Sequence, residues 1–396
     1  MGLHESSLQN KVHGHCDQVF LFLFQLKYMT SDRIKHAQES TLTQEQIRER
    51  FETRRSILEN ACRVHKNSIQ FRKVRSSIQY IQPLEAYYCP IPKCSSTTWK
   101  RLLKSVRDYF DVKKSRIGSP REWSHKRTEN VDAFVFVRDP YSRLLSAYVD
   151  KLFGPNTLYW KRIGTYVVAN FRSYASAKSL RCGHDVTFAE FIKYVIHAQT
   201  TGVHRDWHFI PVHDHCHFCD YPYRYVGHLE TLSEDMQFIL NAIGSPVPYT
   251  SDFDSSTLIN NSNTALSVMR PEIEDCMDLE EAARRIWKKW HARGIISKSE
   301  LFPLASEQME NFDLQYFQNE SLKALNRSES KESRRTQKTE ALTEAYGSVP
   351  LEDRLRLQEL LFLDFELFGF DPAPPEVFPA KFDREDKGYS YFSPYD

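Results

Sequence analysis

One short stretch, CPIPKCSSTTWKRLL from Cys89 to Leu103, places a lysine and four consecutive hydroxyl side chains between an apolar run and a helix-like pattern. A loop that leaves a buried strand and opens a helix points unpaired backbone N–H groups, and the positive end of the helix dipole, at whatever lies in front of it. Lys93 adds a full charge, and Ser95 to Thr98 add hydroxyl donors. The stretch therefore has the components of a phosphate-binding loop. Serine and threonine also cap helix starts, so capping is the alternative role of these hydroxyls.

A second stretch, FVFVRDPYSRLLSAYVDK, has Arg138 at the end of an apolar run and Ser146 eight residues later, in the following helical pattern. Asp139-Pro140 marks a sharp helix start, because proline suits the first turn of a helix. Arginine grips a phosphate with a bidentate fork, and Ser146 can donate a hydroxyl from the helix face. The alternative is that Arg138 forms a structural salt bridge with Asp139 or Asp150.

Two anion sites that follow successive strands predict a ligand with two separate phosphate-like groups. Neither stretch contains the G-x-x-x-x-G-K-[ST] loop that cradles nucleoside triphosphates. The sequence therefore argues against a kinase-like phosphotransferase, which is retained as an alternative.

The stretch HDHCHFC, from His213 to Cys219, contains histidines and a C-x-x-C pair, which are zinc ligands in many proteins. A closed zinc site needs a second pair at suitable spacing, and no other C-x-x-C occurs in the sequence. The eight cysteines are compatible with a few disulfides in a secretory protein, and three Asn-x-Ser sequons permit a lumenal compartment.

Three strand-and-helix units must position these loops. Apolar runs at 84–91, 133–137 and 223–230 are typical of buried strands, and a helical pattern follows each of them. In the third unit Thr231 or Ser233 can cap the helix. Strands that alternate with helices predict an α/β fold, with a parallel sheet flanked by helices on both faces.

The whole chain divides into a leader, a helical arm, a main domain with a less regular insertion, and a tail. The capping-box pair Thr43 and Gln46 begins the arm, and Gly369 ends the last helix of the domain. The predicted segments are 1–42 (leader, irregular), 43–78 (arm), 79–370 (domain), about 250–345 (insertion) and 371–396 (Pro-rich tail).

The charge balance argues against a general nucleic-acid or membrane binder, because 53 basic and 52 acidic residues leave a net charge of +1. Ten basic residues between Lys100 and Arg127 are a local excess, either a surface for an anionic partner or a solvated helix face. The apolar run VFLFLF, residues 19–24, is shorter than the roughly 20 residues that cross a bilayer. It is a marginal signal-peptide candidate, and Gly2 with Ser6 fits the loose myristoylation pattern.

The stretches PKCSSTTWKR and FVRDPYSRLLSAYVDK together resemble the two cofactor loops of the Golgi carbohydrate sulfotransferases, the family of the chondroitin and dermatan 4-O-sulfotransferases and the HNK-1 sulfotransferase. The segment from Asp206 to Leu232 resembles the family's next motifs at matching spacing, and LDFELFGF resembles its closing helix. The resemblance covers about 80–245 and 350–370 and lapses between them. In the first loop Ser95, Ser96 and Thr98 depart from the family pattern but remain small.

This resemblance implies a P-loop-like sulfotransferase core that uses 3′-phosphoadenosine 5′-phosphosulfate. It implies that Lys93 holds the 5′-phosphosulfate and that Arg138 and Ser146 hold the 3′-phosphate. By analogy with phosphoryl transfer, catalysis is then mainly positioning and charge stabilisation, and no metal is required. The cofactor-binding residues implied are Pro92, Lys93, Cys94, Ser95, Ser96, Thr97, Thr98, Trp99, Arg138 and Ser146.

Sulfuryl transfer also needs a general base for the acceptor hydroxyl, and a neutral histidine suits that role near pH 7. His208 is the first candidate, because its DWHFIP segment resembles the family's H-W-R-P, and Glu230 is the second. A lone histidine beside aromatic residues is also typical of a hydrogen-bonded structural residue. The resemblance favours disulfides, rather than zinc, for Cys216 and Cys219.

The expected function is sulfation of a hydroxyl on a glycan or proteoglycan in the Golgi lumen. The family is usually anchored by an N-terminal transmembrane helix, and membrane association is expected on that ground, although no apolar run here is long enough to span a bilayer. No nucleic-acid partner is expected. A non-catalytic glycan-binding protein of the same fold is a further alternative. The sugar that is sulfated is not predicted, because the resemblance lapses in the acceptor-facing segment, 250–345.

Overall fold

The computed structural model describes residues 42–65, 78–111, 132–250, 252–304, 312–328, 330–380 and 389–395. The chain divides into two compact units, Met1–Glu49 and Arg50–Asp396. Of the first unit only 42–49 are described; they contain the start of helix α2 (Gln44–His65), where Thr43 and Gln46 exchange the predicted capping-box hydrogen bonds. The predicted leader up to residue 41, with Gly2 and the VFLFLF run, lies outside the described residues.

The second unit contains a four-stranded sheet in the order β1-β2-β3-β4. Strands β2, β3 and β4 coincide with the three predicted apolar runs to within a few residues. β3 pairs in parallel with both β2 and β4. β1 runs antiparallel to β2, so the sheet is mixed, and the prediction of a parallel sheet is corrected at this edge. The connection explains the difference: a three-residue 3₁₀ turn joins β1 to β2, whereas parallel neighbours need a crossover of about a dozen residues. The strands are β1 (Gln79–Ile81), β2 (Ala86–Cys89), β3 (Asp132–Val137) and β4 (Tyr225–His228).

Helix α3 (Ser96–Tyr109) covers one face of the sheet through the buried ring of Trp99. The centroid of this ring lies 4.6 Å from that of Phe134 and 5.5 Å from that of Phe136. Gly227 on β4 makes room for Phe136, because a Cβ atom at that position would lie 2.6 Å from the ring. The close packing fixes the start of α3, and with it the first predicted loop, against the sheet.

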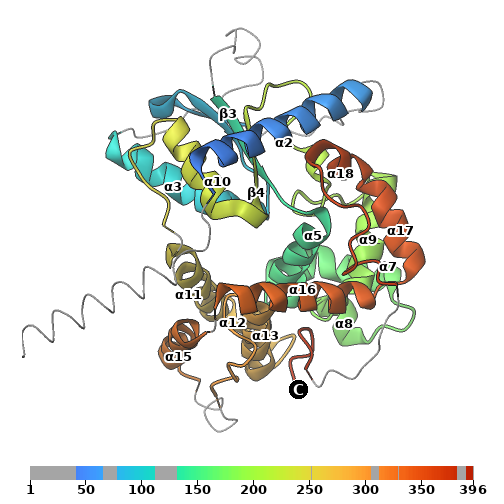
Figure 1. Ribbon diagram of the computed structural model, residues 1–396. Helices are drawn as coiled ribbons and strands as arrows, with labels where there is room; N and C mark the ends of the chain where they lie inside the picture. Colours follow the sequence, from blue (N-terminus) through green and yellow to red (C-terminus); the bar gives the residue numbers. More distant parts are fainter. Residues whose placement is uncertain are drawn as a thin grey trace, which may run out of the picture. The chain divides into compact units, whose positions relative to one another are not determined.

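The first two predicted helices after the strands are α3 and α5, and the third is α10 (Figure 1). The helices of the described chain not yet given bounds are α5 (Pro140–Tyr148), α6 (Thr157–Tyr159), α7 (Thr165–Phe171), α8 (Ala177–Cys182), α9 (Phe188–Thr201), α10 (Leu232–Ala242), α11 (Asp252–Val268), α12 (Arg270–Glu274), α13 (Leu279–Ala292), α15 (Leu314–Arg327), α16 (Lys331–Gly347), α17 (Leu351–Leu360) and α18 (Phe362–Phe368).

From Arg50 onward, α2 packs into the second unit and is not a separate arm. Phe51 stacks on Phe238 of α10 with 5.1 Å between ring centroids. The guanidinium groups of Arg50 and Arg54 donate to the buried carboxylate of Asp235, at 2.9 and 2.6 Å. The C-terminal part of the predicted arm is thus tied to the helix that follows β4.

The segment predicted to be less regular, about 250–345, is largely helical in its described part and is corrected here. The polar stretch NRSESKESRRTQK spans the end of α15 and the start of α16, where Ser330 accepts a capping hydrogen bond from the Ser333 backbone. Trp287 and Trp290 of α13 pack against Phe317 of α15. The apolar side of α11 and of α16 is too weakly marked in the sequence to show a helical period.

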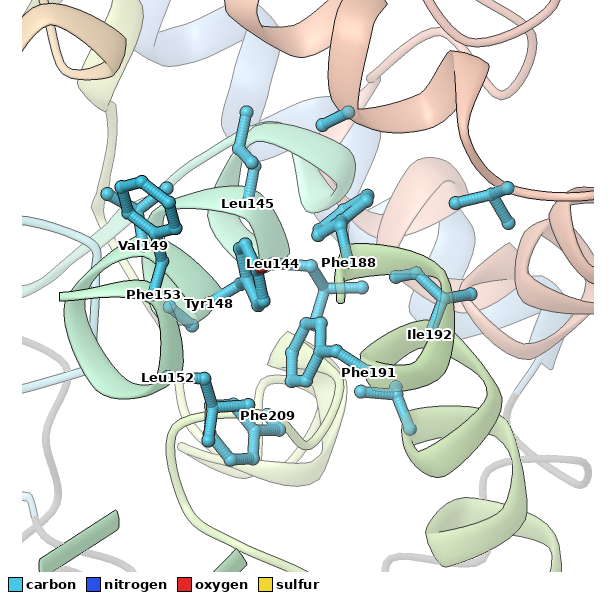
Figure 2. Close-up of a cluster of buried hydrophobic side chains, with 14 of the residues drawn as sticks. Leu144, Leu145, Tyr148, Val149, Leu152, Phe153, Phe188, Phe191, Ile192 and Phe209 are labelled. Atoms are coloured by element: carbon cyan, nitrogen blue, oxygen red, sulfur yellow. The ribbon is translucent and has the colours of Figure 1, made fainter. Parts of the chain in front are cut away.

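A cluster of buried hydrophobic side chains joins α5 to α9 (Figure 2). α5 continues as a wider π-helical turn, η2 (Val149–Phe153). Burying each large apolar side chain contributes roughly 1.5–3 kcal/mol, so the cluster holds the α5–η2 segment firmly in place. Figure 1 shows α16 beside α5 and α9, which it contacts. The labelled members of the cluster are Leu144, Leu145, Tyr148, Val149, Leu152, Phe153, Phe188, Phe191, Ile192 and Phe209.

The C-terminal helical pattern forms two helices, α17 and α18, with a break at Leu361, and it ends at Gly369 as predicted, with a φ angle of 69°. The buried carboxylate of Asp364 accepts hydrogen bonds of 2.7 Å from the backbone N–H groups of Val212 and His213. Within the described residues, no helix combines the length and the apolar character that a membrane crossing requires.

Candidate active site

The first predicted loop joins β2 to α3. Lys93 and Ser95 have φ angles of 68° and 59°, which is a left-handed backbone conformation. This conformation costs a non-glycine residue about 1–3 kcal/mol and is found most often at functional sites. Left-handed residues in such turns also form the backbone nests that bind anions. Ser95 is the N-cap of α3, yet its hydroxyl makes no capping hydrogen bond. The capping alternative therefore does not apply to Ser95, and its hydroxyl stays available to a ligand.

The buried guanidinium of Arg143, on α5, holds this loop in place. It donates to the carbonyl oxygens of Pro92, at 3.1 Å, and Ile210, at 2.7 Å. It also lies 3.3 Å from Nε2 of His215. One side chain thus joins the first loop, the helix of the second loop and the segment that carries His208.

Lys93 is paired with a carboxylate that it shares with two other lysines. Its Nζ lies 3.0 Å from Oδ2 of Asp150, and Nζ of Lys289 lies 3.0 Å from Oδ1. Lys151 lies 3.5 Å from the same carboxylate. Burial lowers the pKa of Lys93 to about 8 despite this carboxylate. Burial acts to raise the pKa of Asp150, but the three lysines outweigh it and hold that pKa well below its usual range.

The second loop presents Arg138 and Ser146 without partners. Among the described residues Arg138 has no hydrogen bond or ion pair, so the salt bridge with Asp139 or Asp150 is absent, and burial lowers the pKa of its guanidinium. Ser146 is a buried residue, 7% exposed, and its hydroxyl has no hydrogen-bond partner in the described chain. Asp139 instead caps α5 by accepting from the Ser142 backbone at 2.7 Å.

His208 forms a hydrogen-bonded group with Asp206 and Tyr159. Its Nδ1 lies 2.9 Å from Oδ1 of Asp206 and 2.8 Å from the Tyr159 hydroxyl. The carboxylate favours a proton on Nδ1, which leaves Nε2 as the proton acceptor. The side chain of His208 is 27% exposed, so Nε2 can meet a solvent-borne substrate. The histidine is oriented by a carboxylate in the way that a general base requires.

A short series of contacts connects His208 to Lys93. The Lys151 ammonium lies 4.7 Å from the ring centroid of Tyr159, whose hydroxyl reaches His208. Lys151 also approaches Asp150, the partner of Lys93. Tyr159, Lys151 and Asp150 thus link the candidate base to the candidate phosphosulfate ligand by successive contacts.

Glu230 lies at the other loop. Its Oε1 accepts a hydrogen bond of 3.1 Å from the Asp139 backbone, and its charge faces the Arg138 guanidinium. These contacts place Glu230 at the start of α5, beside the predicted 3′-phosphate site.

Six of the seven cysteines in the described residues form disulfides: Cys62–Cys219, Cys89–Cys216 and Cys182–Cys276. Both members of the C-x-x-C pair are bonded, each to a distant partner, so neither is a free thiolate for zinc. Among the described residues no cluster of His, Cys, Asp or Glu suits a metal ion. Cys94 in the first loop is a buried free thiol, and burial raises its pKa to about 11, so it is neutral.

The sequence did not reveal several charged groups at this site. Arg143 lies within the second motif, and Lys289, Arg293 and Lys338 belong to the segment predicted to be less regular, about 250–345. The only available signal was the i, i+4 spacing of Lys289 and Arg293 at the end of a helix, which puts both on one face. The pairing of that face with Asp150 depends on tertiary structure.

Comparison with known proteins identifies the family of this chain. The sequence model of the sulfotransferase family matches residues 84–290, more than half of the chain. Carbohydrate sulfotransferase 14 of Danio rerio is 31% identical over 172 residues, 40% of this chain and 46% of that protein. Carbohydrate sulfotransferase 11 of Rattus norvegicus is 33% identical over 218 residues, covering 48% and 61%. Carbohydrate sulfotransferase 8 of Homo sapiens is 30% identical over 215 residues, covering 49% and 50%.

The chain thus spans about half the length of the curated relatives it matches. No solved structure matches it. The family match covers β2 and its loop, β3 and α5 with Arg138 and Ser146, the His208 segment and most of α13. The prediction that the resemblance lapses after about residue 245 is therefore wrong as far as residue 290. The chain belongs to the sulfotransferase family.

Proposed function

We propose that this protein transfers a sulfuryl group from 3′-phosphoadenosine 5′-phosphosulfate to a hydroxyl of a glycan. The observation that carries the proposal is that the two loops present the Arg138 guanidinium and the Ser146 hydroxyl without a hydrogen-bond partner in the described chain. A histidine that a carboxylate orients adds support. The relatives named above are carbohydrate sulfotransferases, which supports a sugar hydroxyl as the acceptor.

The residues of the two loops fit a cofactor with two phosphate-like groups. Arg138 and Ser146 are both without partners among the described residues, as expected for ligands of the 3′-phosphate. The Ser95 hydroxyl is not used as a cap, and the first-turn N–H groups of α3 have no acceptor within their helix. Lys93, with Ser95 to Thr98, would bind the 5′-phosphosulfate. Pro92, Cys94 and Trp99 set the shape of the loop.

In the proposed reaction the acceptor oxygen forms a bond to sulfur while the bond from sulfur to the phosphate oxygen breaks. Nε2 of His208 accepts the proton of the acceptor hydroxyl, and Asp206 stabilises the imidazolium that forms. Lys93 stabilises the negative charge that develops on the leaving phosphate oxygen. Glu230 holds the start of α5 and positions Arg138, and His208 takes the role of base.

The compartment in this proposal is the Golgi lumen, and the acceptor is a glycan or proteoglycan. Three disulfides suit an oxidising compartment. The sequons at Asn260, Asn319 and Asn326 fall in α11 and α15, within the described chain.

The test is transfer of radiolabelled sulfate from the cofactor to a panel of glycans that includes desulfated chondroitin. The wild-type protein should label at least one glycan, and Lys93→Ala and Arg138→Ala should each remove most of that activity.

Adenosine 3′,5′-bisphosphate should stabilise the wild-type protein against heat, and ATP should not. Stabilisation by ATP alone would indicate a phosphotransferase, and glycan binding without any transfer would indicate a non-catalytic protein.

A further inference from the structure

Two cations outside the predicted loops lie beside the site, and neither forms an ion pair with a residue of the described chain. They are Arg293, the residue that follows α13, and Lys338 on α16. Neither side chain has a hydrogen bond or an ion pair with any residue in the described part of the chain. A cation held near other cations without a counter-ion is typical of a binding site for an anion.

α13 brings Arg293 toward the first loop, because its neighbour Lys289 contacts Asp150, the partner of Lys93. Lys289, one helical turn earlier on the same face, reaches Asp150 at 3.0 Å. Arg293 is attracted by the Asp150 carboxylate and repelled by both Lys93 and Arg138. Its charge thus acts on the cationic group of each loop.

α16 places Lys338 at the Arg138 end of the site. The buried Gln337 amide donates to the carbonyls of His291, at 2.6 Å, and Ile296, at 2.9 Å, and so fastens α16 to the end of α13. Gly294, with a φ angle of 56°, lies against the Lys338 side chain: a Cβ there would be 2.8 Å from Cε of Lys338. Lys338 is repelled by Arg138 and Arg293.

The arrangement is electrostatically unfavourable without a ligand. Arg138, Arg293 and Lys338 repel one another, and burial followed by these charges lowers the pKa of Lys338 to about 8. Asp150 is already shared by three lysines. A ligand with several negative charges removes the repulsion, whereas a neutral sugar does not.

We propose that Arg293 and Lys338 form a third anion-binding contact for the bisphosphorylated nucleotide, with Arg293 between its two charged ends and Lys338 beside the 3′-phosphate. This inference rests on the proposed function. The cofactor is favoured over an anionic acceptor because Arg293 acts on the cations of both predicted cofactor loops, Lys93 and Arg138, and Lys338 acts on Arg138. The acceptor base, His208, instead contacts Tyr159 and Asp206.

The test measures binding of adenosine 3′,5′-bisphosphate and of adenosine 5′-monophosphate by calorimetry. Arg293→Ala should weaken binding of both nucleotides about tenfold, because it removes a charge-assisted hydrogen bond. Lys338→Ala should weaken the bisphosphate five- to tenfold and the monophosphate less than twofold. Arg356→Ala, a change of an exposed arginine paired with Glu352 on α17, is the matched control and should alter neither.

Stability without ligand separates a binding role from a structural one. Lys338→Ala should unfold at the same temperature as the wild type or at a higher one, because it removes a repelled cation. Arg293→Ala removes an attraction to Asp150 together with repulsion by Lys93 and Arg138, so its unfolding temperature should stay close to that of the wild type. Arg293→Lys keeps the charge but loses the fork, and should bind with intermediate affinity.

The inference is overturned if the wild type binds the bisphosphate and both alanine variants bind it equally well. It is also overturned if the variants raise only the KM for the glycan. If the wild-type protein does not bind the bisphosphate at all, the proposed function fails first, and this inference fails with it.

Discussion

Asp150 lies among Lys93, Lys289 and Lys151, and replacing it with asparagine tests the electrostatic reasoning most directly. The substitution keeps the shape of the side chain and removes its charge. Two effects of opposite sign are expected: the ligand-free protein loses stability, because the lysines repel one another, and Lys93 becomes free to pair with an incoming anion.

The loss of stability can be estimated from the geometry. Removing one partner of a fully buried ion pair costs about 3–5 kcal/mol. The Asp150 side chain is 26% exposed, against 13% for Lys93 and 12% for Lys289, so solvent screening reduces the expected loss to about 2–3 kcal/mol. The pKa of Asp150 is depressed in the folded state, so its contribution is complete above the unfolded-state value of about 3.8 and is lost as the pH falls through the folded-state value.

Urea unfolding at pH 7 measures the first effect, and calorimetric titration with adenosine 3′,5′-bisphosphate measures the second. Asp150→Asn should lower the free energy of unfolding by about 2–3 kcal/mol and bind the bisphosphate up to about tenfold more tightly. Glu352→Gln removes a surface carboxylate that is 74% exposed and should change stability by less than about 0.5 kcal/mol. Unchanged stability of the Asp150 variant at pH 7, or weaker nucleotide binding, would refute the reasoning.

The other two predictions concern the base and the phosphosulfate lysine. His208→Ala should lower the sulfate-transfer rate about 10²- to 10⁴-fold and leave the affinity for adenosine 3′,5′-bisphosphate unchanged, because the histidine acts on the acceptor side. An equal loss of nucleotide binding would instead indicate a structural histidine. With a pKa of about 8, Lys93 loses its proton as the pH rises above that value, so bisphosphate affinity should fall between about pH 7 and pH 9.5. Lys93→Arg keeps its charge and should flatten this profile; a flat profile in the wild type would contradict the assignment.

The sequence was sufficient for the elements whose signal is local. The apolar runs before Lys93, Arg138 and Glu230 correctly located three strands, because a buried parallel strand is a continuous apolar run. Helix starts at Pro140 and the helix end at Gly369 followed from the chemistry of single residues. The family resemblance then assigned roles to both loops, and the structure shows that Arg138 and Ser146 have no competing partner in the described chain.

Tertiary contacts account for what the sequence did not predict. β1 is three residues long, too short for an alternating pattern to be recognised. The ion pairs of Asp150 could not be predicted from the sequence, because its partners are far away along the chain. Lys93 lies in the first loop, and Lys289 reaches Asp150 only when α13 packs against η2. Ser95 occupies an N-cap position, but the left-handed backbone there is a property of the folded loop.

The disulfides of Cys216 and Cys219 are one of two ways to pair these cysteines with Cys62 and Cys89. Cys216 and Cys219 are three residues apart, but their partners lie 127 and 157 residues earlier and on different elements, the end of β2 and α2. During synthesis Cys62 and Cys89 emerge long before either partner, and exchanging the two partners would also give two bonds. Correct oxidation therefore requires that Cys89 bond to Cys216 and Cys62 to Cys219, and the exchanged pairing can be corrected only by thiol–disulfide exchange, which takes seconds to hours.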